Sequence, residues 1–268
     1  MSLIHSDGCP VIDDNSNQDL LNLDGANPEQ GRGRVPRDYN ATPFGSLPFA
    51  KPVATKPIPR SEWKERIQEM TAKKLILSDM ARRGGVQTKN QGQTNFCWAF
   101  APTLCVEIAR VQAGEKYVDL SPAAIACPVN DFRNVGNWAN KAIAYYAKFG
   151  GVPSSMWPQI AIDRRYDNDK TQAVREQHRV KDWIDLPRNS FDHLMSELLR
   201  LRAVAIGLDA WGHEVTACDP VILKDGRFAA RIWNSWAESW GQRGMSILAE
   251  DYITRGFDQI AVLHSTAL

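Results

Sequence analysis

The sequence contains no run of about 18 apolar residues, the length that a membrane-spanning helix needs. Its 32 basic and 31 acidic side chains leave a net charge of +1, so no excess of positive charge attracts nucleic acid or an anionic membrane. Residues Met1 to Asp7 lack the basic and apolar regions of a secretion signal. Five cysteines, an odd number without a paired framework, favour a reducing compartment. We therefore expect no membrane or nucleic-acid partner, and a location in the cytoplasm or within an assembly built inside the cell.

Motifs for metals and nucleotides are absent as well. The sequence has no Cys-x-x-Cys pair, no glycine-rich phosphate loop and no carboxylate cluster with ligand spacing. No cofactor and no metal are therefore expected. The 268 residues, 43% of them hydrophobic, are enough to bury one large core in two parts.

Composition divides the chain into three segments. Residues 1–60 are rich in Asn, Asp, Gly and Pro without sustained periodicity, which predicts an extended or disordered N-terminal arm that ends in a proline-rich linker. Residues 61–85 form a helical segment, in which Ser61 is the expected N-cap and Trp63, Ile67 and Met70 form an apolar stripe. Residues 86–268 form the main domain.

A cysteine begins the next helical pattern. Leu104, Ile108 and Val111 recur at helical spacing, and Gly114 is a suitable stop. Cys97 therefore lies at a predicted helix start. There the helix dipole and a nearby imidazolium would lower the pKa of its thiol by several units.

A histidine and an asparagine bracket a predicted hairpin. Residues 215–223 and 227–233 are strand-like, and the Asp-Gly pair between them is typical of a tight turn. Such a hairpin brings the His213 end back towards the Asn234 end. Pro220 is expected to break the ladder between the strands and so adjust the register.

These residues are the parts of a thiol nucleophile. His213 would act as general base and acid, Asn234 would hold the imidazole tautomer, and the Gln91 side chain would stabilise an oxyanion together with the Cys97 N–H. A buried cysteine at a helix start is usually only a core residue, and a lone histidine is usually structural. The complete set in this order favours a hydrolase.

The same stretches resemble the papain-like cysteine peptidases from residue 86 to about residue 252. Gln91-Gly92 with Cys97-Trp98-Ala99-Phe100 matches the nucleophile motif of the family, and Asn234-Ser235-Trp236 with Trp240-Gly241 and Gly244 matches its asparagine block. Leu120-Ser121-Pro122 before Cys127, Gly136-Asn137-Trp138, and Gly150-Gly151-Val152 follow in the order of the family.

The resemblance implies an α+β, papain-like fold of two subdomains, one helical and one rich in antiparallel β-strands, with the active-site cleft between them. It assigns catalysis to Cys97, His213, Asn234 and Gln91. Supporting roles fall to two tryptophans, Trp98 and Trp236, the second as a shield of the histidine–asparagine pair. Substrate binding falls to Gly136, Asn137, Trp138 and Glu214.

Several positions depart from the family pattern. Thr94 stands where the family has a disulfide cysteine, so the bridge to the Cys127 position cannot form. Asn95-Phe96 and Asn137 replace small residues along the cleft, where we expect crowding. Glu214 replaces a small residue that helps to line the main specificity pocket; it either favours a basic substrate side chain or is merely a salt-bridged or solvent-facing carboxylate. Pro102 removes a backbone hydrogen bond from the nucleophile helix.

The sequence thus predicts a Cys-His-Asn endopeptidase that hydrolyses polypeptide substrates. Two other functions stay open: a structural or interaction module of a larger assembly such as a virus particle, and acyl transfer to amines. The N-terminal segments, residues 1–85, are either a reduced propeptide or a docking element for a protein partner.

Overall fold

The computed structural model describes residues 3–16, 30–42, 50–52 and 56–265. Its helices are α1 Arg60–Ala72, α2 Leu77–Arg83, α3 Cys97–Gln112, α4 Ala123–Val129, α5 Ala139–Lys148, α6 Asp169–Arg175, α7 Phe191–Leu199 and α8 Glu250–Ile253. Its strands are β1 Leu3–Ile4, β2 Pro10–Ile12, β3 Ala50–Pro52, β4 Val180–Leu186, β5 Val204–Leu208, β6 His213–Ile222, β7 Phe228–Trp233, β8 Met245–Ala249 and β9 Phe257–Ser265.

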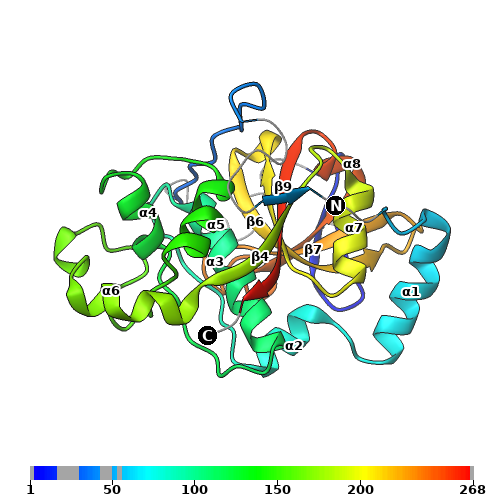
Figure 1. The fold of residues 1–268 in the computed structure, drawn as a ribbon. Coiled ribbons are helices and arrows are strands. Elements are labelled where there is room, and N and C mark those ends of the chain that lie inside the picture. Colours follow the sequence, from blue (N-terminus) through cyan, green and yellow to red (C-terminus); the bar gives the residue numbers. More distant parts are fainter. Residues whose placement is uncertain (1–2, 17–29, 43–49, 53–55, 266–268) are drawn as a thin grey trace.

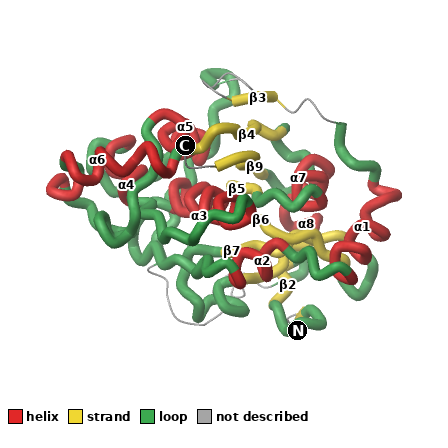
Figure 2. Tube along the Cα trace, turned by 60° about the horizontal axis from the view of Figure 1, so that its bottom comes forward, coloured by secondary structure: helices red, strands yellow, loops and turns green. Residues whose placement is uncertain are grey.

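The described strands form one sheet in the order β1-β2-β8-β7-β6-β5-β9-β4-β3. Figure 2 shows this order from β3 down to β2. Neighbours pair antiparallel except β2 with β8 and β3 with β4, which are parallel. The three central strands β6, β5 and β9 are mostly buried, so the sheet is the frame on which both halves of the molecule are built.

Helices lie on both sides of this frame (Figure 1). Helices α3, α4, α5 and α6 form the helical part, whereas α1, α7 and α8 lie beside the strands. Helix α3 is buried along almost its whole length, and the Thr216 hydroxyl on β6 donates to the Ala101 carbonyl on α3 at 2.9 Å. The predicted α+β fold class is confirmed.

One helix start and one strand register differ from the sequence prediction. Helix α1 begins at Arg60 after Pro59, whose fixed φ suits the entry to a helix, so Ser61 lies inside the helix rather than capping it. The β6–β7 hairpin forms, with Gly226 at φ +89° in the turn. Its register shift lies between Ala217 and Asp219, whereas Pro220 stays paired with Ala230. The irregularity therefore comes from a bulge at Cys218 and not from Pro220.

The N-terminal segment joins the sheet at two places. Strand β2 extends it beside β8, and β3 extends its other edge beside β4. Residues 30–42, here called the arm, lie between these two strands in the sequence and cross the top of Figure 1 above α5 and β6. Part of the predicted linker, residues 53–55, falls outside the described residues.

Candidate active site

His213 and Asn234 lie at the same end of the β6–β7 hairpin. His213 Nε2 is 2.8 Å from Asn234 Oδ1, and the Ser235 N–H donates to that same oxygen at 2.8 Å. Because this oxygen only accepts, Nε2 carries the proton and Nδ1 is left as the base. Nδ1 is buried and has no hydrogen-bond partner among the described residues.

Tryptophans enclose this pair. The Trp236 ring stacks on His213 with centroids 4.4 Å apart and planes inclined by 28°. Trp211 contacts His213 edge-on at 5.5 Å, and Trp240 packs behind both tryptophans. The imidazole is completely buried. Its hydrogen bond to Asn234 is therefore kept from water.

Cys97 is the first residue of α3 and is also completely buried. Burial, with the nearby Glu214 carboxylate, raises the pKa of its thiol, although the backbone N–H groups of Glu214 and Trp98 act in the lowering direction. The expected depression of the thiol pKa is thus wrong for this conformation. The reason is that the thiol is cut off from water, so the helix terminus does not compensate for desolvation.

His213 is likewise held neutral. Burial lowers the pKa of its imidazole to about 3, against the hydrogen bond to Asn234, and the positive charge of Arg32 lowers it further. Arg32 belongs to the arm and donates to the Trp211 carbonyl at 3.0 Å. The closed site therefore contains a thiol and a neutral imidazole rather than an ion pair.

Gln91 holds a peptide carbonyl. Its side-chain nitrogen donates to the Gly31 oxygen at 2.6 Å and to the Thr94 oxygen at 2.9 Å. Its side-chain oxygen accepts from the Ser235 hydroxyl at 2.6 Å, which fixes the orientation of the amide. The Trp236 indole N–H also reaches the Gly31 oxygen at 3.3 Å. A backbone carbonyl of the arm thus occupies the Gln91 side-chain N–H, one of the two donors that were predicted to hold an oxyanion.

Two glycines let the arm approach this closely. A Cβ at Gly31 would overlap the Thr94 carbonyl, and a Cβ at Gly33 would overlap the Asn95 carbonyl. Gly33 also has a φ of +113°, which disfavours other residues. The alternation of glycine and arginine over residues 31–34 is therefore required by the contact.

The arm then pairs with the predicted substrate-binding edge. The Asn137 N–H donates to the Gly33 oxygen at 3.0 Å, and the Val35 N–H donates to the Asn137 oxygen at 3.2 Å, which makes a parallel bridge between Arg34 and Asn137. Gly136 faces the Gly33 carbonyl so closely that a Cβ would overlap it. Trp138 is half-buried at the start of α5.

The expected crowding occurs at Asn95, since a Cβ at Gly33 would lie only 2.7 Å from the Asn95 Cβ, but Asn137 and Phe96 do not contribute to it. The Asn137 amide folds back, since its nitrogen donates to Asn130 Oδ1 at 2.7 Å and its oxygen accepts from the Trp138 N–H at 3.0 Å. Phe96 is completely buried in the core of the helical part. The Asn137 and Phe96 side chains therefore leave room for the arm along the edge of the cleft.

The Arg34 side chain reaches a group of carboxylates. Its guanidinium forms ion pairs with Asp209 and with Asp258, the second at 2.9 Å, and only 2% of the side chain is exposed. Glu214 is buried beside them, and its charge acts on Arg34. Because Glu214 is buried, its interpretation as a solvent-facing carboxylate is wrong, and a role in binding a basic substrate side chain stays a prediction.

Sequence reasoning missed the arm residues and Asp209 and Asp258. The repeated Gly-Arg pairs at residues 31–34 were the available signal, in a segment otherwise typical of a loop.

All five cysteines, including Cys127, are free. Among the described residues no group of three or more His, Cys, Asp or Glu is arranged to hold a metal, and none of the helices there is long and apolar enough to cross a membrane.

Comparison with known proteins identifies the family. The profile described as papain family cysteine protease matches residues 78–230, more than half of the chain. This chain belongs to the papain family. The match includes Cys97, Gln91 and His213 and ends before Asn234.

Curated papain-family relatives are similar over part of their length. Cathepsin L 1 of Paramecium tetraurelia is 30% identical over 60% of this chain and 54% of its own length. Cathepsin K of Mus musculus is 23% identical over 71% of this chain and 62% of its own length. Cysteine endopeptidase RepA of Oryza sativa is 25% identical over 62% of this chain and 50% of its own length. The chain thus spans from half to less than two thirds of these relatives.

Solved structures of the papain family share the fold. Xylellain, a cysteine protease from Xylella fastidiosa, superposes with a TM-score of 0.65 at 16% identity, covering 90% of this chain and 97% of its own. Procathepsin L 3 of the Tenebrio molitor larval midgut superposes with a TM-score of 0.61 at 17% identity, covering 99% of this chain and 82% of its own. The predicted papain-like fold is confirmed.

Proposed function

We propose that this protein is a Cys-His-Asn endopeptidase whose cleft is closed by its own arm. The observation that carries the proposal is the Gly31 carbonyl, which accepts from the Gln91 amide at 2.6 Å beside the His213–Asn234 pair. A peptide carbonyl held by this donor occupies the place that a substrate carbonyl needs. Family membership supports the reaction class.

Each residue has a step in such a reaction. The Cys97 thiolate attacks the substrate carbonyl, and the oxyanion is held by the Gln91 side-chain N–H and the Cys97 backbone N–H. His213 gives its proton to the leaving amine as the acyl-enzyme forms. It then takes a proton from the water that releases the acid. Asn234 keeps Nε2 protonated throughout, so that Nδ1 is the atom that exchanges the proton.

The arm keeps this machinery latent in three ways. It occupies the carbonyl-binding donor, it pairs with the Asn137 edge, and it contributes the Arg32 charge that disfavours imidazolium formation. These contacts favour the propeptide-like interpretation over a docking element for another protein.

Alkylation of Cys97 tests both parts of the proposal. The native protein, the variant Gly31→Ala/Gly33→Ala and the control Val35→Ala are treated with a small haloacetamide at about pH 5.5, where an ordinary thiol barely reacts, and read by peptide mass spectrometry. The two added methyl groups overlap backbone carbonyls and expel the arm, whereas Val35 is 42% exposed. We expect fast labelling of Cys97 only in the double variant, and its loss when His213→Ala is added.

Peptide hydrolysis completes the test. The double variant should cleave a denatured protein substrate, and the parent should cleave it slowly. Labelling of Cys97 no faster than that of Cys105 or Cys218 in the folded double variant would contradict the proposal and favour the structural or interaction module. Amide products formed with an added amine, in place of acids, would indicate acyl transfer.

A further inference from the structure

Residues of three neighbouring strands surround the Arg34 guanidinium beside the Asn137 edge. Glu214 on β6 pairs with Gly207 on β5, and Gly207 pairs in turn with Asp258 on β9. The three residues therefore stand in one row across the sheet. Asp209 follows directly after β5 and closes the end of the row. We call Gly207, Asp209, Glu214 and Asp258 the acidic pocket.

The missing side chain of Gly207 makes the space in this row. A Cβ there would overlap Arg34 Nε and the Asp258 carboxylate. Gly207 lies in the middle of a buried strand, where glycine costs stability relative to other residues. Its place is explained by the guanidinium that lies over it.

The charges in the acidic pocket exceed what the arm supplies. Arg34 pairs through one terminal nitrogen with Asp209 and through the other with Asp258. Asp209 also pairs with the half-exposed Arg188 at 2.9 Å. Glu214 Oε1 is buried and has no hydrogen-bond partner among the described residues. Neighbouring carboxylates of which two, Glu214 and Asp258, lie in a buried row are costly without a cation between them.

We propose that the acidic pocket is a specificity pocket for an arginine side chain of the substrate, and that Arg34 occupies it as an internal ligand. The backbone of Arg34 is bridged to Asn137, at the predicted substrate-binding edge. A peptide that displaces the arm along this edge meets the same carboxylates. The inference deepens the proposed endopeptidase function and rests on it.

The geometry favours arginine over lysine. Asp209 and Asp258 bind different terminal nitrogens of one guanidinium. A lysine ammonium is a single compact charge that does not span two separate carboxylates in this fork. The expected order of preference is Arg, then Lys, then neutral side chains.

Peptide binding tests the acidic pocket without catalysis. The receptor is the full chain carrying Gly31→Ala/Gly33→Ala, Arg34→Ala and Cys97→Ala, so that its own arm offers no cation and no thiol reacts. A synthetic peptide of residues 30–38 is titrated by calorimetry, followed by the same peptide with Arg34→Lys or Arg34→Gln. We expect the Gln peptide to bind at least tenfold more weakly than the Arg peptide, with Lys between them.

A substitution in the receptor then tests whether the preference for the Arg peptide comes from the acidic pocket. Asp258→Asn should remove most of the difference between the Arg and Gln peptides. Because the Arg-to-Gln change is in the ligand, it does not affect folding of the receptor. Equal binding of the two peptides, or no binding of the Arg peptide at millimolar concentration, would overturn the inference.

Kinetics separate this inference from the proposed function. The active double variant is given a library of short fluorogenic peptides in which each position is varied in turn. Preference for Arg at one position, reduced at least tenfold by Asp258→Asn, is the expected result. Cleavage without such a preference overturns the specificity pocket and leaves the endopeptidase intact. Arg-dependent binding without any cleavage removes the endopeptidase function, and with it the substrate role of the acidic pocket.

Discussion

The Arg34 guanidinium lies between Asp209 and Asp258 with only 2% of the side chain exposed. Breaking a buried ion pair by removing one partner leaves the other charges uncompensated, which typically costs about 3 kcal/mol or more. Arg34→Ala should therefore weaken arm closure and speed the alkylation of Cys97 by roughly a hundredfold. Alkylation rates on the full chain measure this effect.

Val35→Ala is the matched control for Arg34→Ala. Val35 is the next residue along the arm, is 42% exposed and uses only its backbone N–H to pair with Asn137. Its alkylation rate should stay within a fewfold of the parent. Equal rates in the two variants would mean that the Arg34 ion pairs contribute nothing to closure.

Gln91 is a residue whose contribution differs between two reactions of the same thiol. Hydrolysis passes through an oxyanion, whereas alkylation by a haloacetamide does not. In the arm-expelled double variant, Gln91→Ala should lower kcat for peptides by roughly a hundredfold or more, the usual effect of losing one oxyanion donor. The alkylation rate of Cys97 should change little. A parallel fall in both rates would assign Gln91 a structural role instead.

At the scale of elements, the arm is an extended segment, bridged to Asn137 at Arg34, whose binding depends on pH. Burial lowers the pKa of His213 to about 3 in the closed state. An open state with an ordinary imidazole pKa takes up a proton that the closed state does not. The contribution of His213 to closure is therefore fully present above about pH 6.5 and is lost progressively as the pH falls towards about 3.

Hydrogen exchange tests this pH dependence. The Val35 and Asn137 amides bond across the bridge between the arm and the cleft edge. Their protection factors, corrected for intrinsic exchange, should fall between pH 7 and pH 4.5. The Thr216 amide, inside the β6–β7 ladder, serves as the reference and should keep its protection. Protection of Val35 that is unchanged or rises on acidification would contradict the linkage.

The helices and the hairpin were predictable because their signals are local. The helical spacing after Cys97 predicts α3, and the Asp-Gly turn predicts the pairing of β6 with β7. The candidate catalytic residues lie within recognisable motifs, so they could be named without coordinates. The bulge at Cys218 and the start of α1 at Arg60 could not be predicted, because sheet register and packing decide them.

The arm and its pocket were beyond sequence reasoning for a different reason. Arg34 meets Asp258 across 224 positions of sequence, and Asp258, Gly207 and Glu214 become neighbours only through the register of β9, β5 and β6. Complete burial of Cys97 also reverses the expected direction of the pKa shift of its thiol. Motif order carries no information on what covers a site.

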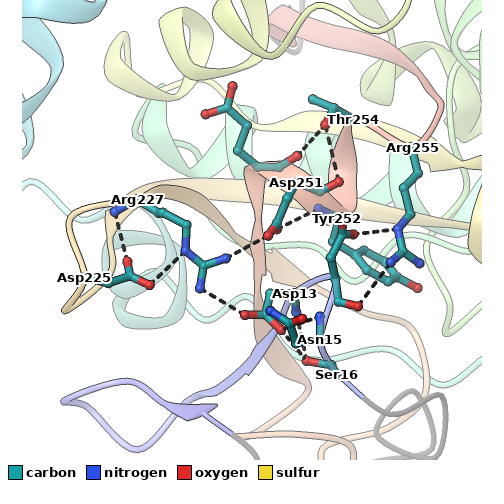
Figure 3. A network of polar contacts seen from close by, with 11 residues as sticks. Asp13, Asn15, Ser16, Asp225, Arg227, Asp251, Tyr252, Thr254 and Arg255 are labelled. Atoms are coloured by element: carbon teal, nitrogen blue, oxygen red, sulfur yellow. Dashed lines mark hydrogen bonds and ion pairs between the residues drawn. The ribbon is translucent and has the colours of Figure 1, made fainter.

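At the scale of the whole molecule, a network of polar contacts ties the segment before the arm to the β-rich part. Figure 3 shows Arg227 between Asp13, Asp225 and Asp251, with Asp13 almost fully buried. Arg255 pairs with the neighbouring Asp14 at 2.6 Å. The chain is thus fixed before the arm, and Arg37 fixes it again through Asp185 at 2.8 Å.

This anchoring predicts a stability effect far from the cleft. Arg227→Ala leaves the buried Asp13 carboxylate without its cation and should lower the free energy of unfolding by about 1–2 kcal/mol. Asp225→Asn, at a side chain that is 50% exposed, is the matched control and should change it by less than about 0.5 kcal/mol. Denaturant unfolding curves measure both. Equal effects would show that the buried contact to Asp13 has no special weight.

The parallel pairing of β2 with β8 gives any maturation of this protein an unusual product. A protease that cuts the chain near the end of the arm, at the exposed Asn40 for example, breaks one peptide bond but none of the contacts of β2 or Asp13. The N-terminal fragment would remain bound as a non-covalent subunit. It would still compete with substrate for the cleft, but the pairing of β2 with β8 would hold it in place instead of a peptide bond. Native chromatography would then show a single species, and only a denaturing gel would show two.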